Sequence, residues 1–212
     1  MLTEPQLKSL KERALEYASA INDQTLEYLS ERGISESIAA NKWLGTVVGN
    51  HPGHEMHQGW LSIPYIVASG YAVGFKFRRL DDGQPKYGSP TGQKSHLYNV
   101  VDINKPSQII ALCEGELDTI VLSEICDVPA VGCPGVSSWK KHYGKLFSGF
   151  EKVLIVGDND VKEDGSNPGQ DFARRVAQEV SHSQVVLLPA GMDVNSYYLA
   201  EGPDKVRERL GL

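Results

Sequence analysis

The chain has few cysteines and no long apolar run, and each absence excludes a class of protein. Its three cysteines, Cys113, Cys126 and Cys133, are odd in number and never form a C-x-x-C pair, so neither a disulfide framework nor a zinc ribbon is encoded. No apolar stretch approaches the roughly 18 residues that a membrane-spanning helix requires. The amino terminus lacks the basic and then apolar layout of a signal peptide. We therefore expect no membrane association and a cytosolic location.

The net charge of −6 does not by itself suggest a protein that binds nucleic acid. The charges are, however, unevenly distributed along the chain. Residues 1–105 hold 11 Lys/Arg and 11 Asp/Glu, whereas residues 106–212 hold 10 and 16, which together make the totals of 21 and 27. Within the neutral half, five basic residues form a strip: Lys76, Arg78, Arg79, Lys86 and Lys94. A basic strip beside an acidic half suggests contact with phosphate groups next to a metal site. Scattered solvated charge is the alternative interpretation of this strip.

Hydrophobic periodicity divides the chain into two expected domains, residues 1–105 and 106–212. The first shows a helix over residues 3–22, a short helix capped by Thr25, a third capped by Ser35, and then a small sheet with a hairpin turn at residues 81–83. In the second, apolar strands alternate with helices, two of which are expected near residues 138–146 and 170–180; the strands are expected at residues 109–113, 129–132, 153–156 and 185–188. Continuously apolar strands alternating with helices predict a parallel sheet covered on both faces.

Acidic residues follow three strands of this predicted sheet. Glu114 and Asp118 come after the first strand, Asp158 and Asp160 after the third, and Asp193 shortly after the fourth. Open parallel sheets carry their chemistry just beyond the carboxyl ends of the strands. Carboxylates brought together there repel one another unless cations neutralise them, and Mg²⁺ favours such oxygen ligands. A single acid at this position is more often a helix cap, but three groups on the strand ends favour a metal site.

These acidic motifs resemble those of the TOPRIM domain, a fold shared by bacterial-type primases, topoisomerases, nucleases and recombination proteins. The motifs are Glu114-Gly115-Glu116-Leu117-Asp118, Asp158-Asn159-Asp160 and Gly191-x-Asp193-x-Asn195. A second run of motifs includes Tyr28-Leu29-x-x-Arg32-Gly33, residues 59–64, Leu80-Asp81-Asp82-Gly83 and Pro85-Lys86-Tyr87. This run is similar to the amino-terminal subdomain of the RNA-polymerase domain of bacterial-type, DnaG-like primases. The resemblance therefore implies a compact phage or mobile-element primase, located in the bacterial or phage-infected host cytoplasm.

The resemblance implies a TOPRIM-type parallel sheet flanked by helices, preceded by a smaller α+β subdomain, and the activity of a DNA primase. Glu114, Asp158 and Asp160 would be the catalytic carboxylates. The ligands of Mg²⁺ or Mn²⁺, in two or more ions, would be Glu114, Asp118, Asp158, Asp160, Asp193 and Asn195. Asn195 stands where the family usually carries a second aspartate. Single-stranded DNA and NTPs would contact Arg78, Arg79, Lys86, Lys94 and Lys76, and a replicative helicase or a separate template-recognition protein would be a partner.

Other functions remain open from the sequence. A TOPRIM nuclease would use the same acids, and a non-catalytic DNA-binding mediator of recombination or replication would lack them. A topoisomerase is disfavoured because 212 residues leave no room for its gate domains. The triplet His51, His54 and His57 has a spacing that a metal site allows, but the Pro-Gly inside it favours an ordinary loop. The stretch from Asp160 to Gly169 is longer than the family's usual D-x-D-x-x-G link, so residues 161–168 are expected to form a loop beside the metals.

Overall fold

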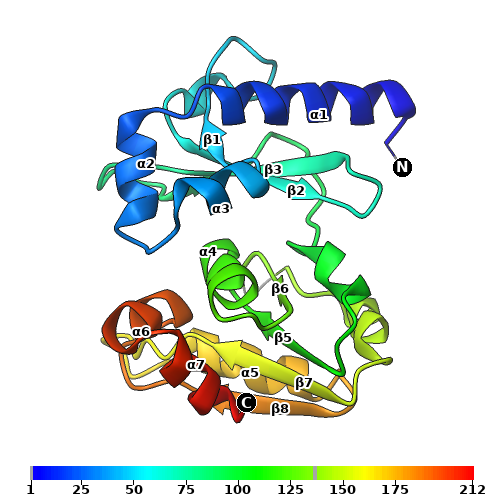
Figure 1. Cartoon of the computed structure of the whole chain (residues 1–212), viewed down its shortest axis with the longest axis vertical. Coiled ribbons are helices and arrows are strands. Elements are labelled where there is room, and N and C mark those ends of the chain that lie inside the picture. The colour runs from blue at the N-terminus through cyan, green and yellow to red at the C-terminus, as the bar shows by residue number, and fades with distance from the viewer. Residues whose placement is uncertain (1, 136–137) are drawn as a thin grey trace. The chain divides into compact units, whose positions relative to one another are not determined.

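The computed structural model describes residues 2–135 and 138–212 (Figure 1). The chain forms two compact units, Met1–Ser95 and His96–Leu212, so the division falls at residue 95 rather than at the expected residue 105. Residues 96–105 belong to the second unit because Leu97 lies in its core and Tyr98 forms an antiparallel bridge with Gly132. In the described part of the chain, no helix has both the length and the apolar character needed to cross a bilayer.

Three helices begin the first unit: α1 (Glu4–Ser19), α2 (Asp23–Ser30) and α3 (Glu36–Asn41). The cap of α2 is Asn22, whose side chain accepts a hydrogen bond from the backbone of Thr25 at 2.9 Å, so the expected Thr25 cap was wrong. Thr25 lies inside the helix, where its buried hydroxyl bonds that of Thr46 at 2.7 Å. Ser35 caps α3 as expected, because its hydroxyl accepts from the backbone of Ile38.

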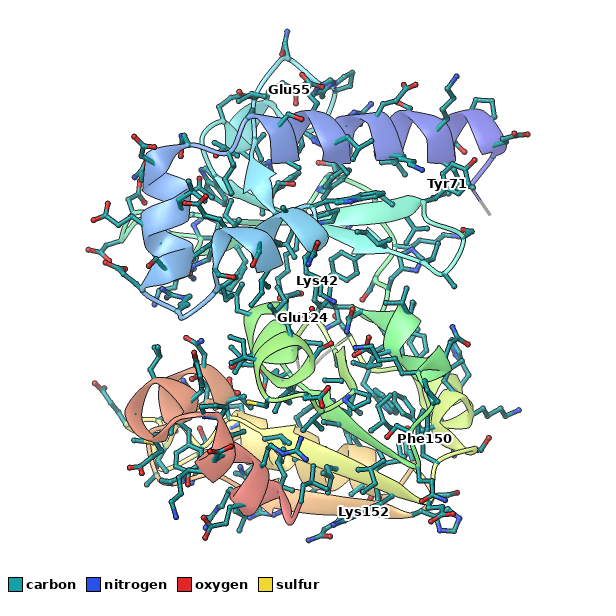
Figure 2. The ribbon with its side chains drawn as sticks, viewed as in Figure 1. Lys42, Glu55, Tyr71, Glu124, Phe150 and Lys152 are labelled. Carbon is teal, nitrogen blue, oxygen red and sulfur yellow. The ribbon has the colours of Figure 1, made fainter. Side chains whose placement is uncertain are left out.

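The sheet of the first unit is antiparallel, with the order β1-β2-β3-β4. Its strands are β1 (Gly45–Thr46), β2 (Leu61–Ile66), β3 (Ala72–Arg78) and β4 (Tyr87–Gly88), and a 3₁₀ turn, η1 (Glu55–His57), precedes β2. Helix α1 packs on this sheet through Ala14 and Tyr17 against Phe75 and Phe77. Gly45 permits the close approach, since a Cβ there would lie 2.0 Å from the carbonyl oxygen of Tyr17. Tyr71, labelled in Figure 2, precedes β3.

The second unit contains a four-stranded parallel sheet with the order β6-β5-β7-β8. Its strands are β5 (Ile109–Cys113), β6 (Ala130–Gly132), β7 (Lys152–Gly157) and β8 (Ser183–Leu187). The helical segments are η2 (Val100–Asn104), α4 (Glu116–Ile120), the π-helical η3 (Val121–Ile125), the 3₁₀ segment η4 (Lys141–Phe147), α5 (Pro168–Ala177), α6 (Val194–Glu201) and α7 (Pro203–Leu210). Figure 2 labels Phe150 and Lys152, which mark the amino end of this sheet where β7 begins.

Helices cover both faces of the parallel sheet. Alternate side chains of β5, such as Ala111 and Cys113, pack with η3, α6 and α7, whereas Ile110 and Leu112 pack with η4 and α5 on the other face. The expected fold class, a helix-flanked parallel sheet preceded by a smaller α+β part, is therefore confirmed (Figure 1). The expected helix near residues 138–146 is instead the 3₁₀ segment η4, and residues 136–137 lie outside the described part.

Candidate functional site

The topology of the parallel sheet brings two acidic segments to one edge. Strands β5 and β7 are hydrogen-bonded neighbours, and Cys113 pairs with Val156 at their carboxyl ends. Glu114 directly follows Cys113, and Asp158 directly follows Gly157, so both side chains leave the sheet at adjacent positions. One carboxylate oxygen of Glu114 is buried from solvent. The sequence pattern of acids after apolar strands therefore corresponds to a real edge of this sheet.

Asp118 links helix α4 to helix α6. Its side chain is only 8% exposed, and its Oδ1 accepts a hydrogen bond from the backbone of Asn195 at 2.9 Å. Gly115, the N-cap of α4, makes room for this carboxylate, because a Cβ on Gly115 would lie 2.4 Å from Asp118 Oδ2. Asn195 thus reaches Asp118 through its main chain, and its own side chain is buried.

The Asp158–Asp160 segment is held close to the start of helix α5. Gly157 and Gly169 touch through their backbones, since a Cβ on Gly157 would lie 2.3 Å from the carbonyl oxygen of Gly169. The side chain of Gln170 donates to the carbonyl oxygens of Gly157 and Asp158 at 3.1 and 3.3 Å. Asp158 is half-buried and Asp160 is exposed. Gly169 therefore packs against the D-x-D segment, although a longer loop than expected separates them.

Asp193 is the N-cap of α6, so the helix-cap alternative weighed for these acids applies to it. Its Oδ1 accepts from the backbone and from the hydroxyl of Ser196 at 2.7 and 2.6 Å. These hydrogen bonds occupy one oxygen of the Asp193 carboxylate. Its negative charge still acts on Asp118 and Asp158 and raises the pKa of both. The same residue thus both caps a helix and contributes negative charge to the edge.

The carboxylates at this edge raise one another's proton affinity. Burial, followed by the charges of Asp193 and Asp158, raises the pKa of Asp118 well above its usual value. Burial raises the pKa of Asp158 from 3.8 to about 7, with Glu114, Asp193 and Asp160 adding to the shift and Lys162 opposing it. Such shifts mean that the fully ionised cluster is unfavourable by itself and that a bound cation would relieve it.

The donor set suits a hard divalent cation. In residues 2–135 and 138–212, no three His, Cys, Asp or Glu side chains converge closely enough to form a complete metal-binding group. The carboxylates therefore gather in one electrostatic cluster without forming a closed shell of ligands. Mg²⁺ fits such an edge because it keeps several water molecules and is commonly held by one or two carboxylates together with substrate phosphates.

Basic and aromatic side chains from strands β3 and β4 and helix α2 lie together in the first unit. Arg78 donates from Nε to the hydroxyl of Tyr28 at 2.9 Å, and its guanidinium lies 4.8 Å from the centre of the Tyr87 ring. The ammonium group of Lys76 lies 4.5 Å from the centre of the same ring. Tyr87 is 42% exposed, so this arrangement presents cations and an aromatic ring together. That combination suits the phosphates and bases of single-stranded nucleic acid.

The remaining predicted basic residues differ in their surroundings. Arg79 forms an ion pair with Asp81 at 3.1 Å, and its guanidinium lies 4.8 Å from the centre of the Trp60 ring. Lys86 and Lys94 are exposed. The backbone of Arg79 donates to the carbonyl oxygen of Lys86, so these two residues face each other across the β3–β4 connection.

The three histidines of the early loop point to separate partners. His51 Nε2 lies 2.7 Å from Glu16, the buried His54 bonds the hydroxyl of Tyr17 at 2.7 Å, and the ring of His57 packs against Phe77 and Trp60. These contacts attach the loop to α1 and to the sheet. Their arrangement supports the loop interpretation of this triplet.

Sequence reasoning missed two groups of residues. Asn159, inside the D-x-D motif, bonds both residues 188–192 and the side chain of Asn167, and Asn167 caps α5. In addition, the buried Asp102 accepts from Ser123 at 2.6 Å and from the backbone of Ala130 at 3.1 Å, which fastens the segment after residue 95 to the second unit. An Asn before Pro168 was the visible signal for the α5 cap; no local pattern marks the other contacts.

Known proteins resemble this chain in sequence and in fold. The family model described as "Toprim domain" matches residues 109–204. The "Gene 57 protein" of Mycobacterium phage D29 is 39% identical over 159 residues, which cover 73% of this chain and 100% of that protein. The DNA primase of Pseudomonas aeruginosa is 29% identical over 162 residues, covering 69% of this chain and 24% of the primase. A solved DnaG primase catalytic domain bound to ssDNA superimposes with a TM-score of 0.78 at 18% identity, covering 97% of this chain and 77% of that one.

The chain therefore belongs to the TOPRIM superfamily and to one family with the mycobacteriophage protein, and bacterial DnaG-like primases are among its homologues. The structural likeness establishes the fold of the primase catalytic core for both units of the chain. The match extends over the whole phage protein but over about a quarter of the bacterial primase.

Proposed function

We propose that the chain is the catalytic core of a DNA primase that joins NTPs into short RNA primers on single-stranded DNA. The observation that carries this proposal is the cluster of mutually repelling carboxylates at the carboxyl edge of the parallel sheet, in a chain whose homologues include bacterial DNA primases. The DnaG domain with the same fold that is bound to ssDNA supports single-stranded DNA as the template.

The proposed reaction is attack of a 3′-hydroxyl on the α-phosphate of an NTP, with release of pyrophosphate. Two Mg²⁺ or Mn²⁺ ions, when bound, would lower the pKa of the attacking hydroxyl and neutralise the charge of the leaving group. Glu114, Asp158 and Asp160 would hold these ions directly. Asp118 and Asp193 would also contribute to the ligand set, although each has one oxygen already bonded to a backbone N–H of α6.

Asn195 has a different role in this proposal from that of a second aspartate. Its backbone fixes Asp118, and its side-chain amide would offer a neutral oxygen to the site. A neutral amide oxygen at this place lowers the negative charge of the edge by one relative to aspartate, so we expect Asn195 to be the weakest of the six ligands.

We assign the template and nucleotide phosphates to the basic residues of the first unit. Arg78 and Lys76 are the strongest candidates because they flank the exposed Tyr87 ring. Arg79, Lys86 and Lys94 would add charge along the same strip. Phosphate contacts of this kind give affinity that falls steeply with salt. A replicative helicase or a template-recognition protein is proposed as the partner that delivers the template, and added partner protein should raise the rate of primer synthesis.

Primer synthesis on a denaturing gel tests the proposed function. The chain is incubated with single-stranded DNA, labelled ATP, the other NTPs and Mg²⁺ or Mn²⁺. Short products that require the template and the divalent ion are expected. Degradation of the template DNA in the same lane, without primers, would instead identify a nuclease that uses the same acids. Template binding with neither reaction would indicate a non-catalytic mediator.

A further inference from the structure

Asn159, the middle residue of the D-x-D motif, makes four hydrogen bonds with segments that are distant in sequence. Its backbone donates to the carbonyl oxygen of Met192 at 3.0 Å, and its carbonyl oxygen accepts from the backbone of Gly191 at 2.8 Å. Its Nδ2 donates to the carbonyl oxygen of Leu188 at 2.7 Å, and its Oδ1 accepts from Asn167 at 2.8 Å. One residue thus joins the end of β7, the turn that leads to α6, and the start of α5.

The orientation of both amides follows from these contacts. Because the carbonyl oxygen of Leu188 can only accept, the amide nitrogen of Asn159 must face it, which leaves Oδ1 to accept from Asn167. Asn167 then uses Nδ2 for this bond and keeps its Oδ1 for the backbone of Gln170, at 3.1 Å, as the cap of α5. Each amide therefore satisfies two partners, and the two side chains form one continuous connection.

This connection spans the two acidic segments that follow neighbouring strands. Asp158 and Asp160 flank Asn159, and Asp193 follows Met192, whose carbonyl oxygen Asn159 holds. The loop of residues 161–167 folds back on itself through a bond from the backbone of Lys162 to the carbonyl oxygen of Ser166 at 2.8 Å. The loop thereby returns the chain to Asn167, beside the segment that it left at Asp160. Mutual repulsion would separate these carboxylates, and the hydrogen bonds of Asn159 oppose that movement.

We propose that Asn159 and Asn167 are positioning residues that hold the Asp158–Asp160 segment and the turn before Asp193 in register for a divalent cation. The inference rests on the metal site of the proposed function. Residues behind metal ligands commonly change metal affinity by about 10- to 100-fold when they are replaced. The side chains of Asn159 and Asn167 are not ligands in this proposal, and they act through the carboxylates.

The test is the affinity of the full chain for Mn²⁺ alone, measured by electron paramagnetic resonance without nucleotide or DNA. Asn159→Ala removes the side-chain bonds of the connection. Asn167→Ser keeps a helix-capping hydroxyl but is too short to reach Asn159. Asn22→Ser is the matched control, because Asn22 caps α2 through an equivalent bond to Thr25 in the other unit.

We expect Asn159→Ala and Asn167→Ser each to weaken Mn²⁺ binding by about tenfold or more. The double variant should lose no more than Asn159→Ala, because both substitutions break one connection, and Asn22→Ser should bind Mn²⁺ like the wild type. If Asn159→Ala does not fold, as judged by circular dichroism, Asn167→Ser decides the question by itself.

Unchanged Mn²⁺ affinity in a folded Asn167→Ser chain, beside a wild type that binds Mn²⁺, overturns this inference and leaves the proposed function standing. Mn²⁺ binding that responds as expected in a protein without primer synthesis supports the inference and overturns primase activity. A wild-type chain that binds no Mn²⁺ overturns both the inference and the metal site.

Discussion

Replacing Asp158 by Asn should stabilise the chain when no divalent cation is present. Burial and the neighbouring carboxylates raise the pKa of Asp158 from 3.8 to about 7 in the folded state. A raised pKa means that the folded state binds this proton more tightly than the unfolded state, so its contribution to stability is present below pH 3.8 and is lost as the pH rises through 7. A neutral Asn removes this pH-dependent loss.

The size of the effect follows from the shift. Three pKa units correspond to at most about 4 kcal/mol at pH 8. Relaxation of the cluster and entry of water reduce this, and about 2 kcal/mol is a reasonable working value. For a chain of this size, that is a rise in melting temperature of roughly 4–8 °C. The difference between variant and wild type should be small at pH 4 and complete above pH 7.

Thermal unfolding followed by circular dichroism measures this difference in EDTA and in Mg²⁺. In Mg²⁺ the advantage of Asp158→Asn should shrink or reverse, because the wild-type carboxylate then has a cation beside it. Asp127→Asn is the control for the loss of one negative charge, since Asp127 is exposed and its left-handed φ of 51° suits Asn. An Asp158→Asn variant that melts at or below the wild-type temperature in EDTA at pH 8 would refute the electrostatic reasoning.

Three further predictions concern other parts of the chain. Burial, followed by the charges of Arg13, His51 and His57, lowers the pKa of His54 from 6.5 to about 4. The free energy of unfolding should therefore fall by on the order of 3 kcal/mol as the pH drops from 6.5 to 4. Urea titrations should show this loss in the wild type and not in His54→Gln. Gly169→Ala should weaken Mn²⁺ binding, because the added methyl group enters the contact with Asp158. Tyr28→Phe should weaken binding of single-stranded DNA a few-fold in fluorescence anisotropy by releasing Arg78, and Arg78→Glu should do so more strongly with a smaller salt slope.

Each of these predictions has a result that opposes it. The same acid dependence in His54→Gln would assign the titration to another group. Gly149→Ala is the control for Gly169→Ala, because a Cβ at Gly149 meets nothing within 4 Å, and equal Mn²⁺ affinity in the two variants would contradict the steric argument. Unchanged DNA binding in Arg78→Glu would remove the basic strip from the template path.

The sequence predicted the parallel sheet because continuously apolar strands and alternating helices have a simple physical cause, burial on both faces. It also predicted that acids follow the strands at the carboxyl edge of the sheet, since parallel strands end on the same side; the roles of these acids as metal ligands stay a prediction. The 3₁₀ segment η4 was not predictable, because it depends on a tertiary contact: a Cβ on Gly144 would lie 2.4 Å from the carbonyl oxygen of Glu179. The Thr25 cap failed because Asn22, three residues earlier, caps the helix by accepting from the backbone N–H of Thr25, which places Thr25 inside α2.

The connection through Asn159 could not be read from the sequence for a similar reason. Its partners are main-chain groups of residues 188–192 and one side chain beyond the 161–166 loop, and their positions depend on the packing of β8 and α5. Residue type alone marks Asn159 only as a polar residue between two acids. The burial of Asp118, which strengthens the case for a cation, likewise becomes visible only when α4 and α6 are both in place.

Incorporation of labelled NTPs by Asp160→Ala, compared with Asp164→Ala, tests the central claim most directly. Both aspartates are exposed and lie four residues apart, but only Asp160 belongs to the acidic edge, whereas Asp164 bonds Ser166 within the loop. The account predicts template-dependent primers from the wild type and from Asp164→Ala, and none from Asp160→Ala, with all three chains equally folded. Wild-type levels of primers from Asp160→Ala would contradict it.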